Sequence, residues 1–272
     1  MNAEDRHGRP RTTRRSRTTR SYDRGYLLSP AKRNQVMELW EIRRYGRDSF
    51  GDADYVHIYG MPPAAWYRQG VRLLARTAVE CVRDALGDLI GAEVARFVHG
   101  APVVSGMTVI DPFAGSCNSL YWILRHLQDA NGVACEVDDA IFAVTSRNRA
   151  VLDVPIELVH GDYSAHLPGC RLPADRFIVV FVAPPWGDAL QQLTGLDLRR
   201  TQPPVCDVVD ICERMFGSHA VLYVTQVHQH IEPASLAELE RRFDWSELHI
   251  YDINVEGMKH GVLLGTQRWM PH

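Results

Sequence analysis

Val109-Ile110-Asp111-Pro112-Phe113-Ala114-Gly115-Ser116 has the pattern of a buried strand that ends in an acidic residue, followed by a tight turn and the start of a helix. Gly115 lets the backbone approach a ligand closely, and the N-terminus of the following helix offers free N–H groups to a carboxylate. A dinucleotide-phosphate loop would need three spaced glycines, and only Gly115 is present. Asp111 would repel a pyrophosphate but suits an ammonium group, so the stretch indicates an amino-acid-like ligand.

Short apolar strands and amphipathic helices alternate through the rest of the C-terminal part of the chain. The strands are expected at 107–111, 132–136, 156–160, 177–182, 220–225, 248–253 and 262–267. The helices are expected at 116–128, 138–152, 204–216 and 235–243. A short turn around Glu256-Gly257 separates the last two strands, which we therefore expect to pair antiparallel. The predicted fold class is α/β: a Rossmann-like, seven-stranded, mostly parallel sheet with an antiparallel terminal hairpin.

The first hundred residues have helical periodicity. Apolar residues recur at helical spacing in two stretches, 31–45 and 71–98. The segment between them is aromatic, with Tyr55, Tyr59, Trp66 and Tyr67 around Met61-Pro62-Pro63. These rings form either a lid that selects a ligand or the core of a helical cap. We expect a disordered basic tail (1–25), a mostly helical cap or acceptor region (26–104) and a ligand-binding α/β domain (105–272).

The composition is that of a folded protein that does not enter a membrane. Apolar residues make up 46% of the 272 residues and charged residues 23%, enough to bury a full core. No run approaches the ~18 apolar residues of a membrane-spanning helix, and the N-terminus lacks the apolar segment of a secretory signal. The cysteines form no Cys-x-x-Cys pair, so no zinc or dithiol centre is expected. These features predict a soluble cytoplasmic protein without a metal site.

Charge is distributed unevenly along the chain. Residues 1–25 carry eight arginines and three acidic residues, a net charge of +5, whereas the whole chain has −3 and the remainder therefore −8. A basic arm can bind a phosphate backbone by releasing counterions. Arg, Thr and Ser runs also bury little apolar surface, so the alternative is a solvated tail, or one that results from a translation start placed too far upstream.

Two further strand ends carry residues suited to an adenosine. Glu136 ends the second strand, where an acidic side chain can accept hydrogen bonds from both ribose hydroxyls, although it could also be a surface carboxylate beside the helix N-cap Asp138. Asp162 and Tyr163 follow the third strand. Asp162 can accept from an adenine amino group while Tyr163 flanks the ring, but Gly-Asp turns are also common for purely structural reasons.

The strongest signal lies at the fourth strand end, Val180-Phe181-Val182-Ala183-Pro184-Pro185-Trp186-Gly187. A buried strand that runs into two prolines cannot continue its ladder, so the prolines leave backbone carbonyls free and fix their direction. Such carbonyls can accept from an exocyclic amine, and Trp186 can stack on a planar ring, which is worth ~1–3 kcal/mol per base. The alternative is a rigid turn with a core tryptophan.

The ordered set Asp-Pro-Phe-Ala-Gly-Ser, Glu136, Gly-Asp-Tyr and Pro-Pro-Trp-Gly resembles class I S-adenosylmethionine-dependent methyltransferases, and among them the N-methyltransferases of nucleic acids. The likeness to the trimethylguanosine synthase-like (RNA cap guanine-N2 methyltransferase) family also includes Leu196-Asp197-Leu198-Arg199 and the strand from Tyr251 to Gln267. The resemblance implies a methyltransferase domain over 105–272, with S-adenosylmethionine as cofactor.

The resemblance also implies a role for each residue of these motifs. The cofactor residues would be Asp111, Phe113 and Gly115 for the methionine and ribose, Glu136 for the ribose, and Asp162 and Tyr163 for the adenine. The catalytic residues, which receive and stack the acceptor, would be Pro184, Pro185 and Trp186.

Two departures from the family pattern bear on the acceptor and the cofactor. Ala183 stands where the family has Asp, Asn or Ser, which removes one hydrogen bond to an acceptor amine, and Cys117-Asn118 replaces the second glycine of the first loop. The motifs and the basic tail favour N-methylation of an RNA nucleobase or a similar planar amine. Ala183 and the acidic body favour a small planar metabolite, methylated at N, O or C. A non-catalytic module that binds S-adenosylmethionine is a third interpretation, against which the intact Pro-Pro-Trp argues.

Overall fold

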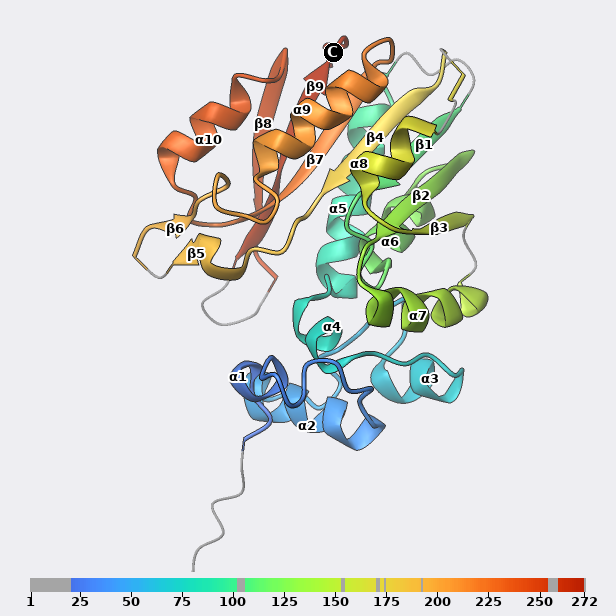
Figure 1. The fold of residues 1–272 in the computed structure, drawn as a ribbon, viewed down its shortest axis with the longest axis vertical. Coiled ribbons are helices and arrows are strands. Elements are labelled where there is room, and N and C mark those ends of the chain that lie inside the picture. Colours follow the sequence, from blue (N-terminus) through green and yellow to red (C-terminus); the bar gives the residue numbers. More distant parts are fainter. Residues whose placement is uncertain are drawn as a thin grey trace, which may run out of the picture.

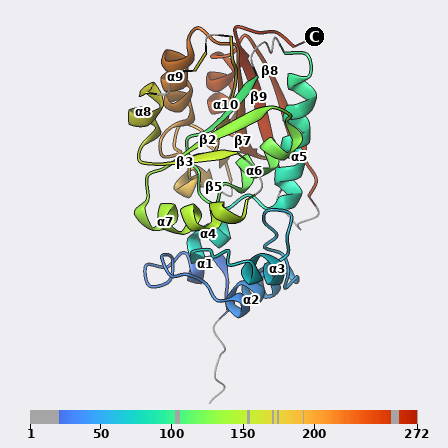
Figure 2. The same ribbon diagram turned by 90° about the vertical axis from the view of Figure 1, so that its right-hand side faces the viewer.

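The computed structural model describes residues 21–101, 106–152, 155–169, 172–173, 175–191, 193–253 and 259–271. Figure 1 shows a central sheet with helices on both sides and a group of short N-terminal helices at one end of it. Figure 2, turned by 90°, shows the same group beneath the sheet rather than beside it. We call this N-terminal group the cap.

Within the described residues, seven strands form one sheet. In their order across the sheet they are β3 (Ile156–His160), β2 (Ala130–Glu136), β1 (Met107–Asp111), β4 (Phe177–Val182), β7 (Val221–His228), β9 (His260–Gln267) and β8 (Trp245–Tyr251). The strands from β3 to β7 are parallel, whereas β9 pairs antiparallel with both β7 and β8. Every residue of β1 and β4 is buried, as expected in a sheet covered on both faces. The predicted mixed sheet with a terminal antiparallel pair is confirmed.

Two apolar cores hold helices on the two faces of the sheet. The helices are α5 (Asp84–Val98), α6 (Asn118–His126), α7 (Asp139–Asn148), α8 (Tyr163–His166), α9 (Val205–Phe216) and α10 (Pro233–Glu240). One core joins α5 and α6 to the sheet through side chains such as Ile90 and Leu120. The other joins α8, α9 and α10 through side chains such as Val208 and Leu239. Helix α7 follows β2 and contacts β2 and β3.

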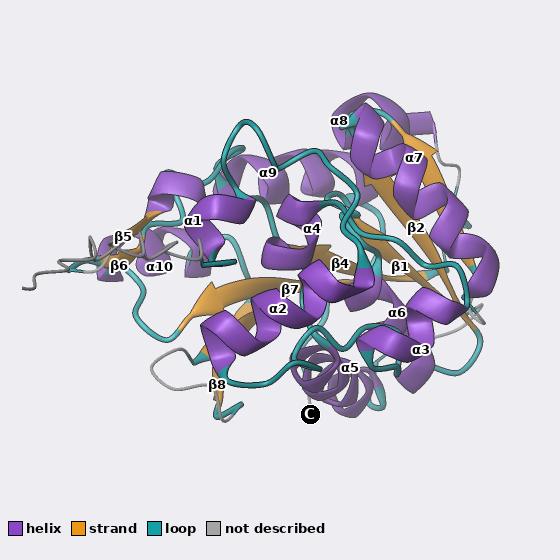
Figure 3. Ribbon diagram, turned by 90° about the horizontal axis from the view of Figure 1, so that it is seen from below, coloured by secondary structure: helices purple, strands orange, loops and turns teal. Residues whose placement is uncertain are grey.

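The cap has an aromatic core of its own. Its helices are α1 (Arg24–Leu27), α2 (Leu39–Phe50), α3 (Pro63–Arg68) and α4 (Ala75–Glu80), which Figure 3 shows from below, in front of the sheet. Trp66 is fully buried and donates its Nε1–H to the Val56 carbonyl at 3.0 Å, and Tyr59 is 3% exposed. For these two rings the structure therefore shows a cap core, and the lid interpretation is wrong.

Two helical predictions for the cap need correction. The helix expected over 31–45 begins only at Leu39, because Val36 bridges to Leu74 and Glu38 forms a capping box with Glu41. The helix expected over 71–98 is interrupted at Cys81, whose backbone is extended and separates α4 from α5.

A small hairpin after the Pro-Pro-Trp motif was not predicted. Its strands, β5 (Leu190–Gln191) and β6 (Gly195–Leu196), pair antiparallel. Two-residue strands have no measurable period, so sequence patterning cannot detect them.

The basic tail can be compared with the structure only at its end. Residues 21–25, which we assigned to the tail, belong to the cap, because the Asp23 carboxylate accepts the Tyr26 N–H at 2.9 Å and caps α1. Residues 1–20 lie outside the described part of the chain. No helix of the described part has the length and apolarity needed to cross a bilayer.

Candidate active site

The motifs meet at the carboxyl ends of the parallel strands, on the side of the sheet that the cap covers. The chain order reverses between β1 and β4, since β2 and β3 lie on one side of β1 and β4 and β7 on the other. Ligands of open α/β sheets bind at such a switch point. Asp111 ends β1 on one side of it, and Pro184 and Pro185 follow the end of β4 on the other. The first and fourth motifs therefore border the same switch point.

Asp111 is a buried carboxylate that forms no ion pair within the described part of the chain. Its side chain is 1% exposed, and Oδ1 accepts the Phe113 N–H at 2.9 Å. Burial raises the pKa of Asp111 to about 7; the Phe113 hydrogen bond opposes this effect and the nearby Glu136 carboxylate adds to it. A cationic ligand at this strand end would relieve the cost of ionising Asp111.

Glu136 bridges two segments of backbone beside Asp111. Its side chain is 7% exposed, Oε2 accepts the Gly115 N–H at 3.0 Å, and Oε1 accepts the Asp138 N–H at 2.8 Å. Burial raises the pKa of Glu136 despite these hydrogen bonds. Glu136 is therefore no surface carboxylate, and each of its oxygens keeps a lone pair for a hydroxyl donor.

The loop between Asp111 and α6 has two residues in the left-handed region. Gly115 has φ 51° and Cys117, the N-cap of α6, has φ 58°. A Cβ is disfavoured in this region of backbone space. Cys117-Asn118 stands where the family pattern has a glycine, and Cys117 adopts a backbone conformation that suits glycine although it carries a side chain. The Gly115 carbonyl accepts the Thr145 hydroxyl of α7 at 2.6 Å, which helps to hold the loop.

The third motif contributes less ligand surface than predicted. The Tyr163 ring is 5% exposed and packs edge-on against Phe113 with centroids 5.4 Å apart. Asp162 is exposed, but its Oδ1 accepts the Ser164 N–H at 2.8 Å and caps α8, the structural role that the sequence also allowed. The structure thus brings Phe113 and Tyr163 together and leaves Asp162 at the rim.

Val137 is a candidate that the sequence analysis missed. It directly follows Glu136 and is 67% exposed, an unusual environment for a β-branched apolar side chain next to a buried carboxylate. The signal that could have found it is an apolar residue directly after an acidic strand end.

Trp186 lies in a cluster with two histidines that sequence order does not reveal. Its ring is parallel to that of His260, with centroids 5.5 Å apart, and perpendicular to that of His228, with centroids 6.3 Å apart. His228 ends β7 and His260 begins β9, and the two residues are register partners. We call Trp186, His228 and His260 the aromatic corner.

The two histidines of the aromatic corner favour the neutral form. Burial lowers the pKa of His260 to about 4, with further lowering by His228 and Arg83, and burial also lowers the pKa of His228. His228 Nδ1 lies 3.1 Å from the His230 backbone nitrogen and 3.4 Å from the His230 carbonyl oxygen, so the backbone of His230 positions the His228 ring. The corner is therefore aromatic and uncharged at neutral pH.

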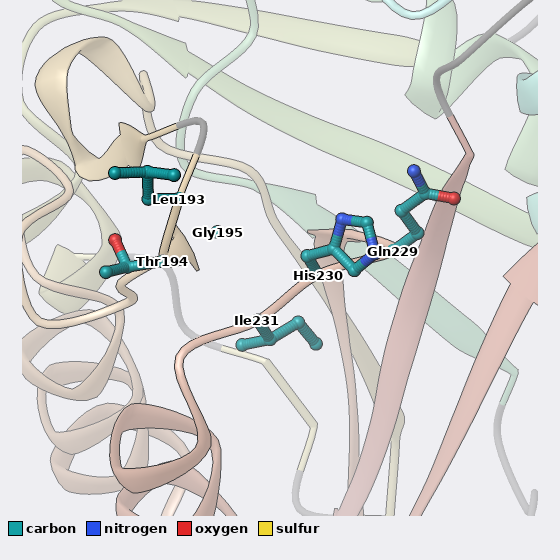
Figure 4. Close-up of a pocket in the computed structure, with 6 residues that line it drawn as sticks. All are labelled: Leu193, Thr194, Gly195, Gln229, His230 and Ile231. Atoms are coloured by element: carbon teal, nitrogen blue, oxygen red, sulfur yellow. The ribbon is translucent and has the colours of Figure 1, made fainter.

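A hollow of about 420 Å³ lies between the β5–β6 hairpin and the segment that follows β7 (Figure 4). Its lining residues are Leu193, Thr194, Gly195, Gln229, His230 and Ile231, all of them uncharged or weakly basic. The His230 ring lies 5.7 Å from that of His228, so the hollow continues the corner toward the β5–β6 hairpin. A planar molecule of moderate size would find apolar and hydrogen-bonding contacts here.

No family model and no curated protein matches this chain. Among solved structures it is similar to the human methyltransferase 10 domain containing protein, with 14% identity, a TM-score of 0.44, and coverage of 68% of this chain and 84% of that one. It is also similar to a methyltransferase from Geobacter sulfurreducens (17% identity, TM-score 0.43, 75% and 86% covered). A third similar structure is the spermidine synthase from Thermotoga maritima (10% identity, TM-score 0.45, 72% and 63% covered). Identities of 10% to 17% and TM-scores below 0.5 assign no function to this chain.

Replacement of Cys117 tests the left-handed backbone of the loop. Both Cys117→Gly and Cys117→Ala remove the buried thiol, but only the glycine variant also removes the Cβ. A Cβ in the left-handed region costs ~1 kcal/mol. We expect the glycine variant to be at least as stable as the alanine variant in urea unfolding. At the control position Cys212, inside α9, alanine should be the more stable by ~1 kcal/mol. If alanine stabilises the protein relative to glycine by the same amount at both positions, the left-handed backbone at Cys117 is contradicted.

Asp111 should make stability depend on pH. Its folded-state pKa lies above the unfolded value, so its contribution is complete below about pH 4 and is lost as pH rises through about 7. Without ligand, the wild type should lose free energy of unfolding relative to Asp111→Asn between pH 5 and 8, by at most ~1.4 kcal/mol per pH unit. Urea titrations across this range measure the difference, and a constant difference would refute the prediction.

Proposed function

We propose that this chain is an S-adenosylmethionine-dependent methyltransferase. The observation that carries the proposal is the pair of buried carboxylates, Asp111 and Glu136, at neighbouring strand ends beside the switch point. Buried carboxylates need cations or hydrogen-bond donors as partners. S-adenosylmethionine has an ammonium group and two ribose hydroxyls, so the residues present fit this cofactor.

When bound, S-adenosylmethionine supplies a methyl group that its sulfonium already activates. The protein then has to orient the reactants and exclude water more than to supply a strong base. In the proposed complex, Asp111 pairs with the ammonium group and Glu136 accepts from the ribose hydroxyls. Phe113 and Gly115 line the methionine and ribose.

We place the adenine beyond Glu136, at the outer end of the cofactor site. Val137 offers an exposed apolar surface to a planar ring. Asp162 keeps one carboxylate oxygen, Oδ2, for the adenine amino group. Tyr163 acts by packing on Phe113.

We propose that the acceptor is a planar molecule that carries an amine. Pro184 and Pro185 direct backbone carbonyls toward the amine hydrogens, and the ring stacks on Trp186. The Pro185 carbonyl also accepts the Gln202 N–H at 3.4 Å and keeps its second lone pair for the amine. Attack by a neutral amine places positive charge on the nitrogen before its proton leaves to water. Aromatic faces stabilise a cation, whereas a charged imidazole would oppose it, so the neutral His228 and His260 suit this chemistry.

Two acceptor classes fit this description. A nucleobase of RNA, or a base resembling one, is supported by the Pro-Pro-Trp-Gly motif and the basic tail. A small planar metabolite is supported by the charges near the hollow. Arg199 pairs with both Asp197 and Glu232 at 2.8 Å, and Lys259 pairs with Asp252 at 2.9 Å, so these cations are already neutralised.

Loss of the Glu136 carboxylate should weaken cofactor binding. We expect Glu136→Ala to weaken binding of S-adenosylhomocysteine by ~1–3 kcal/mol, because ribose hydroxyls lose their buried partner. Isothermal titration calorimetry measures the dissociation constant. Glu157→Ala, which removes an exposed carboxylate from the neighbouring strand β3, should leave it unchanged. Equal constants for wild type and Glu136→Ala would show that the ribose lies elsewhere.

Labelled methyl transfer tests the acceptor. Protein is incubated with a host extract and S-adenosylmethionine labelled in the methyl group, and the products are separated by acid precipitation. Label that ribonuclease releases from the precipitate identifies RNA, and soluble label identifies a small molecule. Trp186→Ala should lower the transfer roughly 5- to 150-fold, the equivalent of ~1–3 kcal/mol of stacking, while S-adenosylhomocysteine binding persists. Unchanged transfer by this variant would remove Trp186 from the acceptor site.

A further inference from the structure

The cap contacts the proposed cofactor loop directly. Tyr59, in the turn before α3, donates its N–H to Asn118 Oδ1 at 2.8 Å and its hydroxyl to the Ser116 carbonyl. Asn118 in turn donates to Asp84 Oδ1 at 3.1 Å, at the start of α5. These bonds hold the end of the loop where α6 begins.

A second link from the cap reaches Glu136. Arg76 of α4 donates from Nη2 to Asp138 Oδ1 at 2.5 Å. The Asp138 N–H donates to Glu136 Oε1 at 2.8 Å, and Glu136 Oε2 accepts the Gly115 N–H at 3.0 Å. A continuous chain of hydrogen bonds therefore runs from a cap guanidinium to the backbone of the loop at Gly115.

The Arg76 side chain is buried, and attachment of the cap to the α/β domain does not by itself explain this burial. It is 8% exposed, and its Nε is buried without a partner among the described residues. Asp138 also has hydrogen-bond partners other than Arg76, because its Oδ1 accepts the N–H groups of Ala140 and Ile141 and caps α7. Burial opposes ionisation of Asp138, but the hydrogen bonds from Arg76, Ile141 and Ala140 and the charge of Arg76 together outweigh it, so the pKa of Asp138 is lowered.

The cap is also fastened to the α/β domain elsewhere. Asn148 of α7 accepts the Arg72 N–H at 2.9 Å and donates to the Arg72 carbonyl at 2.7 Å. Gly60, in the turn before α3, donates its N–H to Asp84 Oδ2 at the start of α5 at 2.9 Å. The buried guanidinium of Arg76, which is costly to desolvate, therefore needs an explanation other than docking of the cap.

We propose that Arg76 is a positioning residue of the cofactor site. It holds Asp138 and, through the Asp138 N–H, keeps the Glu136 carboxylate in the orientation that receives the ribose hydroxyls. This inference rests on the proposed binding of S-adenosylmethionine. It gives the cap a role in binding the cofactor.

Calorimetry with S-adenosylhomocysteine tests this role. Arg76→Ala should weaken binding about 10-fold or more. The matched control is Arg72→Ala, another cap arginine, whose side chain donates to the carbonyls of Tyr67 and Val71 rather than to Asp138. This control should change binding less than about 2-fold.

A double-mutant cycle separates positioning from general destabilisation. If Arg76 acts through Glu136, Arg76→Ala combined with Glu136→Gln should bind within about 2-fold of Glu136→Gln alone. A further 10-fold loss in the double variant would show independent effects and overturn the proposal. Thermal unfolding of each variant checks that it is folded.

Asp138→Asn provides the test if Arg76→Ala does not fold. Asparagine still caps α7 and keeps the N–H that faces Glu136, but it lacks the charge that holds Arg76. We expect about a 5-fold loss of S-adenosylhomocysteine binding, and unchanged binding would overturn the proposal. If the folded wild type does not bind S-adenosylhomocysteine, the proposed function itself fails. If it binds and Arg76→Ala binds equally well, only the role of Arg76 fails.

Discussion

The Glu136 carboxylate joins the ends of the first two strands, and the geometry of the site depends on it. One oxygen receives the N–H of Gly115 in the loop after β1, and the other receives the N–H of Asp138 at the start of α7. The loop before α6 and the start of α7 are thereby held at a common carboxylate. Because Asp111 is buried beside Glu136, both the loss of solvent and the repulsion between the two carboxylates oppose ionisation of Asp111. Stability is thus lowered at the place where a cationic ligand would restore it, as is common at binding sites.

The sequence predicted the half of the site that is local along the chain. Buried strands such as 177–182 are apolar runs bounded by turn residues, so the strand ends at Asp111, Glu136 and Val182 follow from local pattern. Once the strands are parallel, their carboxyl ends must share an edge, and the motifs meet without further information. The left-handed backbone at Cys117 lies beyond this reasoning, because a cysteine does not signal a positive φ.

The acceptor half depends on pairing between distant segments. His260 reaches Trp186 because β9 inserts between β7 and β8, and the register places His260 opposite His228. Hydrophobic periodicity identifies strands but does not predict which strands are neighbours in the sheet. The same limit applies to the cap, where Trp66 belongs to a core whose members range from Leu27 to Tyr121, and its aromatic character alone did not distinguish a lid from a core.

The two halves of the proposed site are assembled differently along the chain. The proposed cofactor residues lie within one continuous stretch, 111–163, whereas Trp186, His228 and His260 come from three separate segments of the chain. Substitutions in the second set leave the hydrogen bonds of Asp111 and Glu136 untouched. Acceptor preference can therefore change through substitutions that leave the proposed cofactor contacts unaltered.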